Sequence, residues 1–468
     1  MRQGPFDLPQ LEAPSLKQQP VSVTRKMAAA LPKLQAQARS SGLKIHHLGA
    51  GYPHPEVTDP RAFLAHQRRY VEHLAKGNGA TEDPELASIL RQAFSYTDTL
   101  GPASTRQLFA GVYGRDWDVE IDPDHLIPTV GATGGINLLC SLFERPGQPV
   151  AYLTDAPTYA GFMARALLCQ HAAIYSVEMD DEGPIIERFR AQIRQARADG
   201  YSVPFYYTVP DGHNPAGFSF SHRRREAILE AARDEGVLIV EDAPYVYISY
   251  ADPAQRPRPF FAMDPEQAVH VFTASKIGFP GPRIGFTYSR ARVAIADGER
   301  ALTELLLTEA SADTLFQNPY ALRGFEALLV DEAFEPRPSL WPVAEEKLAV
   351  YRENRQILLD GFDRHLGPHR DRFHWTEPAA GFFSVLTFRD PGITTDDAFM
   401  ARLVSEHGVV AIPMYDFYPP DAKRRDPRAG LDQIRVSFCF SESFGENRRR
   451  DLQEAVEALC AAVLSVSS

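Results

Sequence analysis

The sequence predicts an α/β protein in which a mostly parallel sheet is covered by helices and a smaller α+β domain follows. From about residue 60 to residue 330, helical patterns alternate with short apolar strands, which is typical of a parallel sheet between helices. After about residue 335 the chain instead shows a long charged helix, several strands and a closing helix. Its 468 residues, 44% hydrophobic and 24% charged, suffice to bury more than one core.

The first elements are predicted from local composition and periodicity. Residues 1–20 are rich in Pro and Gln and are expected to be extended or poorly ordered, and a helix is expected from about Val21 to Ser41. The segment Leu48–Pro53 is predicted to be a strand that runs into a turn. Four apolar segments are then predicted as strands of the large sheet, namely 149–153, 204–208, 237–240 and 269–272.

The last third is predicted to start with an amphipathic helix from Val343 to Leu366 and to close with a helix near 447–464. Between them, strands are expected at 382–386, 409–412 and 434–438. The Pro-rich segment Phe334–Pro338 is the predicted domain boundary. We therefore divide the chain into an N-terminal arm (1–45), a large domain (46–335) and a small domain (336–468), with residues 46–60 contributing to the small domain and a substrate loop.

Composition excludes several classes of function. A net charge of −12 argues against binding of nucleic acid over the whole chain. No apolar run of 18 residues or apolar signal-peptide segment is present, so neither a membrane partner nor export is expected. The spacing of the four cysteines suggests no metal site or disulfide framework, which fits a reducing cytoplasm.

Lys276 is the most informative residue. It ends the tetrapeptide Thr273-Ala274-Ser275-Lys276, directly after an apolar segment, so it is predicted to lie at the carboxyl end of a buried strand, where open α/β sheets bind ligands. Its amine can form a Schiff base with an aldehyde cofactor. The hydroxyls of Thr273 and Ser275, with Arg283 in the following turn, can hold a phosphate group. By itself, a Ser-Lys pair is more often a solvated surface feature.

Two clusters before Lys276 are suited to such a cofactor. Thr129–Gly135 combines a strand end, small residues and a helix start, which can cradle phosphate with backbone N–H groups. Tyr159 follows a strand and can stack on a flat ring. An ordinary glycine-rich turn and a core tyrosine are the alternative interpretations.

Two further clusters follow predicted strands. In Pro210–Gly217, the Asn-Pro turn fixes Asn214, which can donate to a phenolic oxygen. Asp242 ends an apolar strand and needs a cationic partner, for which a protonated pyridine nitrogen would serve, and Tyr245 can contact the ring oxygen. A structural turn and an aspartate that caps the next element are the alternatives.

Taken in order, these clusters resemble the class I/II aminotransferases, fold-type I enzymes that depend on pyridoxal 5'-phosphate (PLP). Within that group the chain is most similar to the kynurenine/2-aminoadipate aminotransferase branch, from about Leu48 to the C-terminus. The resemblance implies a PLP-binding large domain with a mostly parallel seven-stranded sheet between helices.

The resemblance also implies roles for individual residues. Lys276 matches the catalytic lysine, and Arg435, Gly51 and Asn214 match the substrate-binding positions. Tyr96 resembles a tyrosine that reaches the partner subunit's cofactor phosphate, which implies a homodimer with shared active sites. With Tyr96, the cofactor-binding set is Gly131, Ala132, Thr133, Tyr159, Asn214, Asp242, Tyr245, Thr273, Ser275, Lys276 and Arg283, and no metal site is implied.

The sequence departs from the family pattern at four places. The usual Asn-Pro-Thr-Gly is Asn-Pro-Ala-Gly, Thr273 replaces a common serine, and Gly101–Arg106 lacks the common Leu-Arg. The stretch Thr308–Pro342 does not resemble the family's usual helix-rich region.

The resemblance implies transamination, in which Lys276 forms the Schiff base and an amino group moves from an L-amino acid to a 2-oxo acid. The same cofactor residues serve β- or γ-elimination, replacement or cyclisation of an amino acid in specialised metabolism, and this alternative stays open. A DNA-binding regulator with an aminotransferase-like domain is disfavoured, because about 45 residues without a helix-turn-helix pattern precede the fold. We expect a cytoplasmic homodimer in amino acid metabolism and biosynthesis.

Overall fold

The computed structural model describes residues 42–57, 60–77, 93–145, 147–277, 280–439 and 443–466, together with residues 32, 33, 36, 91 and 441. The extended start expected at 1–20 and most of the helix expected at Val21–Ser41 lie outside the described residues. None of the helices in the described part of the chain combines the length and apolar character needed to cross a bilayer.

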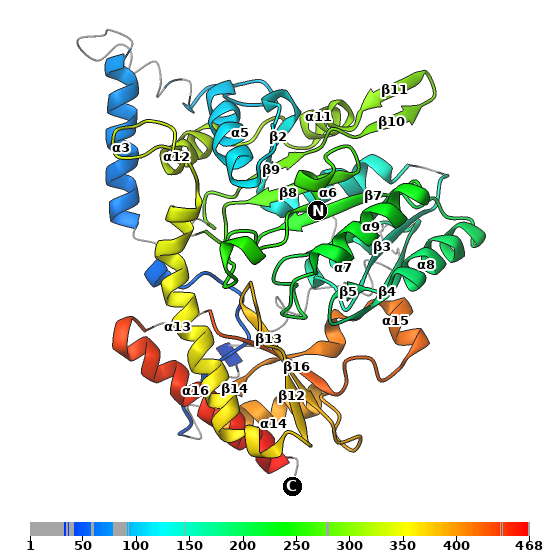
Figure 1. Ribbon diagram of the computed structural model, residues 1–468, viewed down its shortest axis with the longest axis vertical. Helices are drawn as coiled ribbons and strands as arrows, with labels where there is room; N and C mark the ends of the chain where they lie inside the picture. Colours follow the sequence, from blue (N-terminus) through cyan, green and yellow to red (C-terminus); the bar gives the residue numbers. More distant parts are fainter. Residues whose placement is uncertain are drawn as a thin grey trace, which may run out of the picture.

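A large sheet forms one half of the molecule, with strand order β2-β9-β8-β7-β6-β3-β4-β5 (Figure 1). The predicted mostly parallel sheet is confirmed, since β4, β3, β6, β7 and β8 pair in parallel and β9 runs antiparallel to both neighbours. A two-residue strand, β5, adds an eighth member at one edge. The strands are β2 (Leu126–Val130), β3 (Val150–Ala156), β4 (Ala172–Asp180), β5 (Gly183–Pro184), β6 (Phe205–Thr208), β7 (Leu238–Ala243), β8 (Ala268–Thr273) and β9 (Ile284–Tyr288).

Helices cover both faces of this sheet because successive strand residues point to opposite sides. Tyr206 belongs to the core on one face and Tyr207 to the core on the other. The first core contains residues of α5, α8, α9, α10 and α12, and the second contains residues of α6, α7 and α11. The bounds of these helices and of α3 are α3 (Pro60–Gly77), α5 (Ala103–Trp117), α6 (Gly131–Phe143), α7 (Ala160–Ala166), α8 (Ile186–Ala198), α9 (His222–Asp234), α10 (Phe260–Met263), α11 (Leu302–Asp313) and α12 (Pro319–Leu329).

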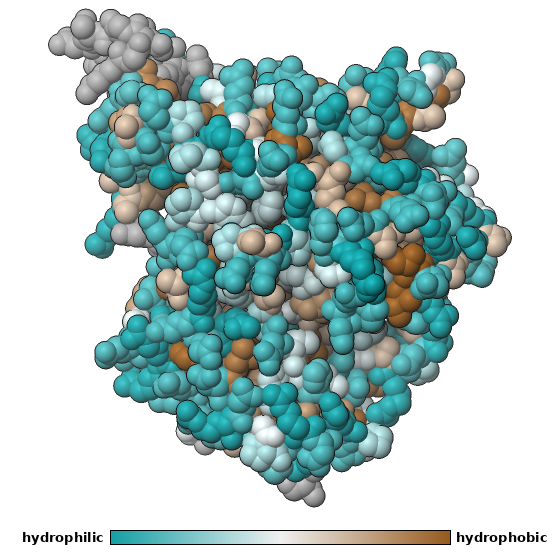
Figure 2. Space-filling model, viewed as in Figure 1, coloured by the Kyte–Doolittle hydropathy of each residue, from teal (hydrophilic) through white to brown (hydrophobic). Residues whose placement is uncertain are grey.

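A smaller antiparallel sheet, in the order β12-β13-β16-β15, occupies the other half. The predicted long helix and closing helix are confirmed as α13 and α16, which pack together beside this sheet (Figure 1). The elements are α13 (Trp341–His365), β12 (Phe373–Trp375), β13 (Phe383–Phe388), α14 (Asp397–His407), β14 (Val409–Val410), β15 (Ile412–Pro413), α15 (Pro420–Arg425), β16 (Gln433–Ser437) and α16 (Gly445–Val466). In the space-filling view the surface is mostly hydrophilic, and paler residues are scattered along the middle of the face shown (Figure 2).

The strand predicted at Leu48–Pro53 is wrong. The strand here is β1 (His46–His47), which pairs in parallel with β14. Beyond Leu48 the carbonyls of Gly49, Ala50 and Gly51 accept hydrogen bonds from side chains instead of from a neighbouring strand. The strand expected at 409–412 is likewise divided into β14 and β15, because Val410 pairs with β1 whereas Ile412 pairs with β16.

The stretch Thr308–Pro342 is more helical than its sequence indicated. It contains the end of α11, all of α12 and the start of α13. Asn318 begins α12 because its Oδ1 accepts from the backbone N–H groups of Tyr320 and Ala321. The proposed boundary Phe334–Pro338 lies between α12 and α13, and the division into domains stays a prediction.

The remaining short elements lie in connections. A hairpin, β10 (Arg292–Ile295) and β11 (Gly298–Ala301), extends from the large half (Figure 1). The 3-10 turns are η2 (Pro55–Val57), η3 (Pro123–His125), η4 (Pro253–Gln255), η5 (Gly367–His369) and η6 (Met414–Phe417).

Candidate active site

A pocket lies at the carboxyl ends of β7 and β8, beside the first turn of α6. Parallel strands bring the residues that follow them to one edge of the sheet, which is why positions far apart in the sequence meet here. The predicted cofactor residues that line this pocket are Ala132, Thr133, Tyr159, Asn214, Asp242, Tyr245, Thr273, Ser275, Lys276 and Arg283.

One end of the pocket is suited to an anion. The helix α6 begins at Gly131 behind Val130, an apolar residue that cannot cap the N–H groups of the first turn. Arg283 Nη1 donates to Ser275 Oγ over 3.2 Å, and Thr273 Oγ1 lies 2.9 Å from the same oxygen. A Cβ at Gly131, where φ is +64°, would lie 2.5 Å from Arg283 Nη2, so only glycine admits the guanidinium. Backbone N–H groups, hydroxyls and a guanidinium can together hold a phosphate group.

Asp242 lines the pocket at the end of β7. Its Oδ2 accepts from the Tyr207 hydroxyl over 2.7 Å, whereas Oδ1 is buried without a hydrogen-bond partner among the described residues. Burial raises the pKa of the Asp242 carboxyl to about 7, while the Tyr207 hydrogen bond and the Lys276 charge oppose that rise. A bare buried carboxylate oxygen is costly, so Oδ1 is suited to receive a cationic N–H of a ligand.

The amine of Lys276 is held between the two halves. Its Nζ donates to the Gly51 carbonyl over 2.9 Å and lies 6.0 Å from the ring centres of Tyr245 and Phe382. Burial lowers the pKa of Lys276, as do the nearby Arg283 and Arg435 charges. A lowered pKa leaves more of the amine neutral, which is the form that acts as nucleophile and base.

Arg435, on β16, reaches the pocket from the small sheet. Its Nη1 donates to Asn214 Oδ1 over 2.7 Å and its Nη2 to the Gly49 carbonyl over 2.9 Å. Its Nε is buried without a partner among the described residues, and Phe383 lies 4.0 Å from the guanidinium. Because a guanidinium only donates, the acceptor must be Oδ1, so the amide Nδ2 of Asn214 is left to donate to a ligand.

Two tyrosines complete the lining. Tyr245 is buried, and burial raises the pKa of its phenol, so the hydroxyl stays protonated and can donate. Tyr159 stands at the start of α7, where Gly161 leaves room for its ring because a Cβ at that position would collide with it.

The turn that carries Asn214 is tied to the end of β3. His213 Nδ1 accepts from the Ala216 N–H over 3.2 Å, so its Nε2 carries the proton and donates to Asp155 Oδ2 over 3.1 Å. Thr208 Oγ1 donates to the same carboxylate oxygen over 2.7 Å. Asp155 and His213 are fully buried, so this network fixes the turn from behind the pocket.

Sequence reasoning missed three contributors. Tyr207 holds Asp242, and both Ser437 and Cys439 donate to the Ala50 carbonyl. Ser437 lies two residues after Arg435 on β16, so the two-residue period of a strand could have indicated it. No local signal could have found the Ala50 contact, because the partners lie 387 residues apart.

Tyr96 is the predicted cofactor residue that the fold of one chain does not bring to the pocket. Its side chain is 86% exposed, and its ring meets Phe316 edge-on with 5.7 Å between centres. Its predicted role toward a partner subunit stays a prediction.

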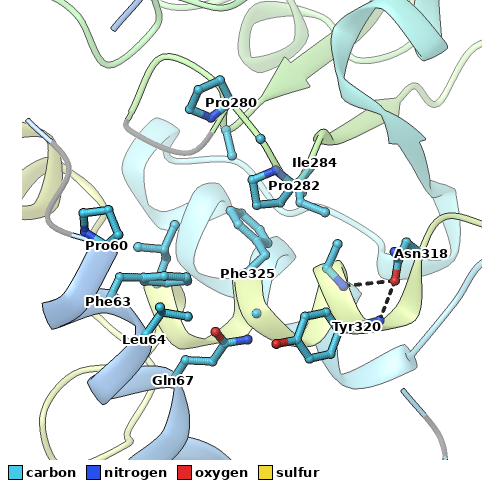
Figure 3. Close-up of a pocket in the computed structure, with 15 residues that line it drawn as sticks. Pro60, Phe63, Leu64, Gln67, Pro280, Pro282, Ile284, Asn318, Tyr320 and Phe325 are labelled. Atoms are coloured by element: carbon cyan, nitrogen blue, oxygen red, sulfur yellow. Dashed lines mark hydrogen bonds between the residues drawn. The ribbon is translucent and has the colours of Figure 1, made fainter. Parts of the chain in front are cut away.

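A larger, apolar cavity of about 510 Å³ lies apart from these polar groups. Phe63 and Leu64 of α3 face Tyr320 and Phe325 of α12 across it, with Pro280 and Pro282 at another side (Figure 3). None of the described residues that line it carries a charged side chain, so it is suited to hydrophobic contact.

Comparison with known proteins decides the family. The model of the family described as aminotransferase class I and II matches residues 65–437. The chain belongs to this family. Class I and II aminotransferases depend on pyridoxal 5'-phosphate, so this protein is a PLP-dependent transferase that moves an amino group between an amino acid and a 2-oxo acid.

Similar aminotransferases come from distant organisms. The (S)-3,5-dihydroxyphenylglycine transaminase of Amycolatopsis orientalis is 27% identical over 84% of this chain and 83% of its own length. The mitochondrial kynurenine/alpha-aminoadipate aminotransferase of Rattus norvegicus is 27% identical over 70% of this chain and 72% of its own. The Pyrococcus horikoshii kynurenine aminotransferase structure is 21% identical, with a TM-score of 0.76 over 99% of this chain and 98% of that one, and so shares the fold. These relatives favour amino-group transfer over elimination, replacement or cyclisation.

Proposed function

We propose that this aminotransferase performs its reaction in the pocket around Lys276, with Lys276 as the catalytic residue. The observation that carries the proposal is the meeting of three groups in one place. These are the half-buried amine of Lys276, the Asp242 Oδ1 that has no hydrogen-bond partner among the described residues, and the Arg435–Asn214 pair.

The residues of this pocket fit PLP. Thr273, Ser275, Arg283 and the first turn of α6 would hold its phosphate, and Asp242 its ring nitrogen. Asn214 and Tyr245 would contact its phenolic oxygen, and Tyr159 its ring face. When bound, the cofactor supplies an aldehyde that takes up the amino group and a ring that withdraws electrons from the substrate Cα. Asp242 would favour the electron-withdrawing form by holding a proton on the ring nitrogen.

Lys276 would hold the cofactor through its amine and, once released by the incoming amino acid, would remove the proton from the substrate Cα. Burial lowers its pKa, which favours the neutral amine over the charged form. Arg435 would grip the substrate carboxylate, because a guanidinium can bind a carboxylate through two parallel hydrogen bonds. The Asn214 and Gly49 oxygens orient that guanidinium before substrate arrives.

For the amino donor, we propose L-amino acids with aromatic side chains. The described surroundings of Arg435 and Lys276 include Phe382, Phe383 and Phe417. Relatives named for dihydroxyphenylglycine, aromatic amino acids and kynurenine support the same class. Such rings bury a large apolar area and pack well against one another.

The test is a single half-reaction of the holoenzyme with a panel of aromatic, aliphatic and acidic L-amino acids. We expect aromatic donors to give equal amounts of 2-oxo acid and pyridoxamine 5'-phosphate, measured by mass spectrometry. A donor that loses a side-chain group and leaves no pyridoxamine 5'-phosphate would instead indicate elimination.

We further propose a homodimer with shared active sites. Phe94 is 76% exposed and its ring lies 5.5 Å from that of Tyr320, while Tyr96 contacts Phe316 nearby. The apolar cavity between α3 and α12 includes Tyr320 in its lining, so the apolar surface is continuous (Figure 3). Exposed apolar surface of this kind marks interaction sites. A second copy seated on this face would allow Tyr96 to approach the partner subunit's phosphate end.

A cytoplasmic location and a part in amino acid biosynthesis belong to the same proposal. All four cysteines are free thiols, and Cys140, Cys439 and Cys460 are buried, which fits a reducing compartment.

A further inference from the structure

Tyr207 lies behind the pocket and does not line it. It stands on β6, fully buried, and donates its hydroxyl to Asp242 Oδ2 over 2.7 Å. The other carboxylate oxygen, Oδ1, has no partner among the described residues although it is buried. One oxygen of Asp242 is therefore tied to the protein, and the other is left for a ligand.

The fold holds the Tyr207 ring in one place. Tyr207 pairs with Val240 across the parallel strands β6 and β7, so it lies diagonal to Asp242 on the same face of the sheet. Phe162 of α7 stacks on the ring, with 3.8 Å between centres and 8° between planes. A ring that is stacked on Phe162 and carried by a paired strand directs its hydroxyl with little rotational freedom.

We propose that Tyr207 is a positioning residue for the proposed cofactor site: it binds Asp242 through Oδ2, aims Oδ1 at the cofactor ring nitrogen and helps keep the carboxylate ionised. This inference rests on the proposed function, in which Asp242 holds that nitrogen.

The charges around the pair support this role. Tyr207 and Lys276 are the groups that lower the pKa of Asp242 against the effect of burial. Burial raises the pKa of the Tyr207 phenol, and Asp155 on β3 and Tyr159 at the start of α7 raise it further. The hydroxyl therefore stays protonated and remains a donor. Without the Tyr207 hydroxyl, the pKa of the Asp242 carboxyl would rise further, and the carboxyl would be protonated at neutral pH.

The test compares Tyr207→Phe with the wild type in equilibrium binding of pyridoxamine 5'-phosphate, which binds without a covalent bond to Lys276. Dialysis of the full chain from pH 5 to pH 9 gives the dissociation constant at each pH. We expect binding about tenfold weaker at neutral pH. We also expect the acidic limb of the binding profile, which is the pH range in which binding is lost as the pH falls, to move up by about one pH unit.

Tyr152→Phe is the matched control. Tyr152 is equally buried, borders the same Phe162 and donates to Glu144, which does not line the pocket. It tests the loss of a buried phenol hydroxyl from the same core and should leave both the affinity and the acidic limb unchanged. If Tyr207→Phe matches Tyr152→Phe in the binding profile, the positioning role of Tyr207 is disproved.

Asp242→Asn separates this inference from the proposed function. If Asp242→Asn binds weakly at every pH and has lost the acidic limb while Tyr207→Phe binds normally, only the Tyr207 inference fails. If Asp242→Asn binds normally, the role proposed for Asp242 fails as well.

A second variant at position 207 distinguishes loss of the hydrogen bond from a folding defect in Tyr207→Phe. Site-specific 3-fluorotyrosine at position 207 keeps the hydroxyl and makes it a stronger donor. Its acidic limb should move to lower pH, opposite to that of Tyr207→Phe, whereas a packing defect would not reverse the direction.

Discussion

At the residue scale, Lys276 shows how burial prepares a reactive group. Lys276→Ala removes the amine that we propose attaches the cofactor and moves the Cα proton, so we expect amino-group transfer to fall by about 10²–10⁴-fold or more. Intact mass after borohydride reduction should show no pyridoxyl adduct on the variant.

Lys347→Ala is the control for this prediction. Lys347 is half-buried like Lys276, its pKa is also lowered by burial, and its Nζ donates to the Val57 carbonyl over 2.8 Å, but it does not line the pocket. Its variant should keep the adduct. A pyridoxyl adduct on Lys276→Ala would place the attachment elsewhere.

Asp242 gives a pH-dependent prediction for the cofactor-free protein. Burial raises the pKa of its carboxyl from 3.8 to about 7, so the folded state binds a proton that the unfolded state releases between these values. Asp242 therefore lowers the stability of the cofactor-free protein progressively as pH rises from about 4 to about 7. We expect cofactor-free Asp242→Asn to be more stable than the wild type at pH 8, by up to about 4 kcal/mol, and to differ little near pH 4.

Denaturant midpoints of both proteins at pH 4.5 and pH 8 would check this. With PLP bound the order at pH 8 should reverse, because only the carboxylate can hold the protonated ring nitrogen. Equal midpoints at both pH values without cofactor would show that the carboxyl does not titrate as its burial implies.

At the scale of elements, two departures from the family pattern turn out to be partners. Thr105 stands where the family commonly has leucine, and its hydroxyl and that of Ser104 donate to Glu326 of α12. Tyr70 of α3 and Arg323 donate to the same buried carboxylate, over 2.9 and 3.0 Å. The unusual α12 is therefore joined to α5 and α3 through one fully buried carboxylate.

Glu326→Ala should test this junction. It removes the buried carboxylate that accepts from Arg323 and from three hydroxyls, so we expect the free energy of unfolding to fall by about 3–5 kcal/mol. Glu332→Ala is the control, because the Glu332 pair with Arg69 is exposed and should change stability by less than about 1 kcal/mol. Urea denaturation of both variants measures the difference, and equal midpoints would refute the role of Glu326.

The sequence allowed the strands that carry the site to be predicted, because 204–208, 237–240 and 269–272 are continuous apolar segments. The same signal indicated that Asp242 and Lys276 share a sheet edge. It could not indicate that Leu48–Pro53 lacks a strand, since its carbonyls are taken by Arg435, Ser437 and Lys276 from distant segments. Nor could it indicate Tyr207, whose partner is set by the register of β6 and β7.

At the scale of the whole molecule, the proposed homodimer gives a prediction for the exposed Tyr96. If each site combines Lys276 of one chain with Tyr96 of the partner subunit, Lys276→Ala and Tyr96→Ala should each impair activity strongly. In a mixed dimer of the two variants, one site has lost both residues and the other keeps both. Random pairing then predicts recovery of about one quarter of wild-type activity.

Co-expression of the two variants with different affinity tags, followed by purification through both tags, isolates the mixed dimer. Each mixed dimer should have about half the activity of a wild-type dimer. Sedimentation should show a dimer for each variant, because neither substitution changes a residue that lines the apolar cavity between α3 and α12. A mixed dimer with no more activity than the mean of the two parents would mean that Tyr96 acts within its own chain or not at all. A monomeric wild-type protein in sedimentation would instead disprove the shared site, because the exposed Phe94 and Tyr96 would then have no second copy to contact.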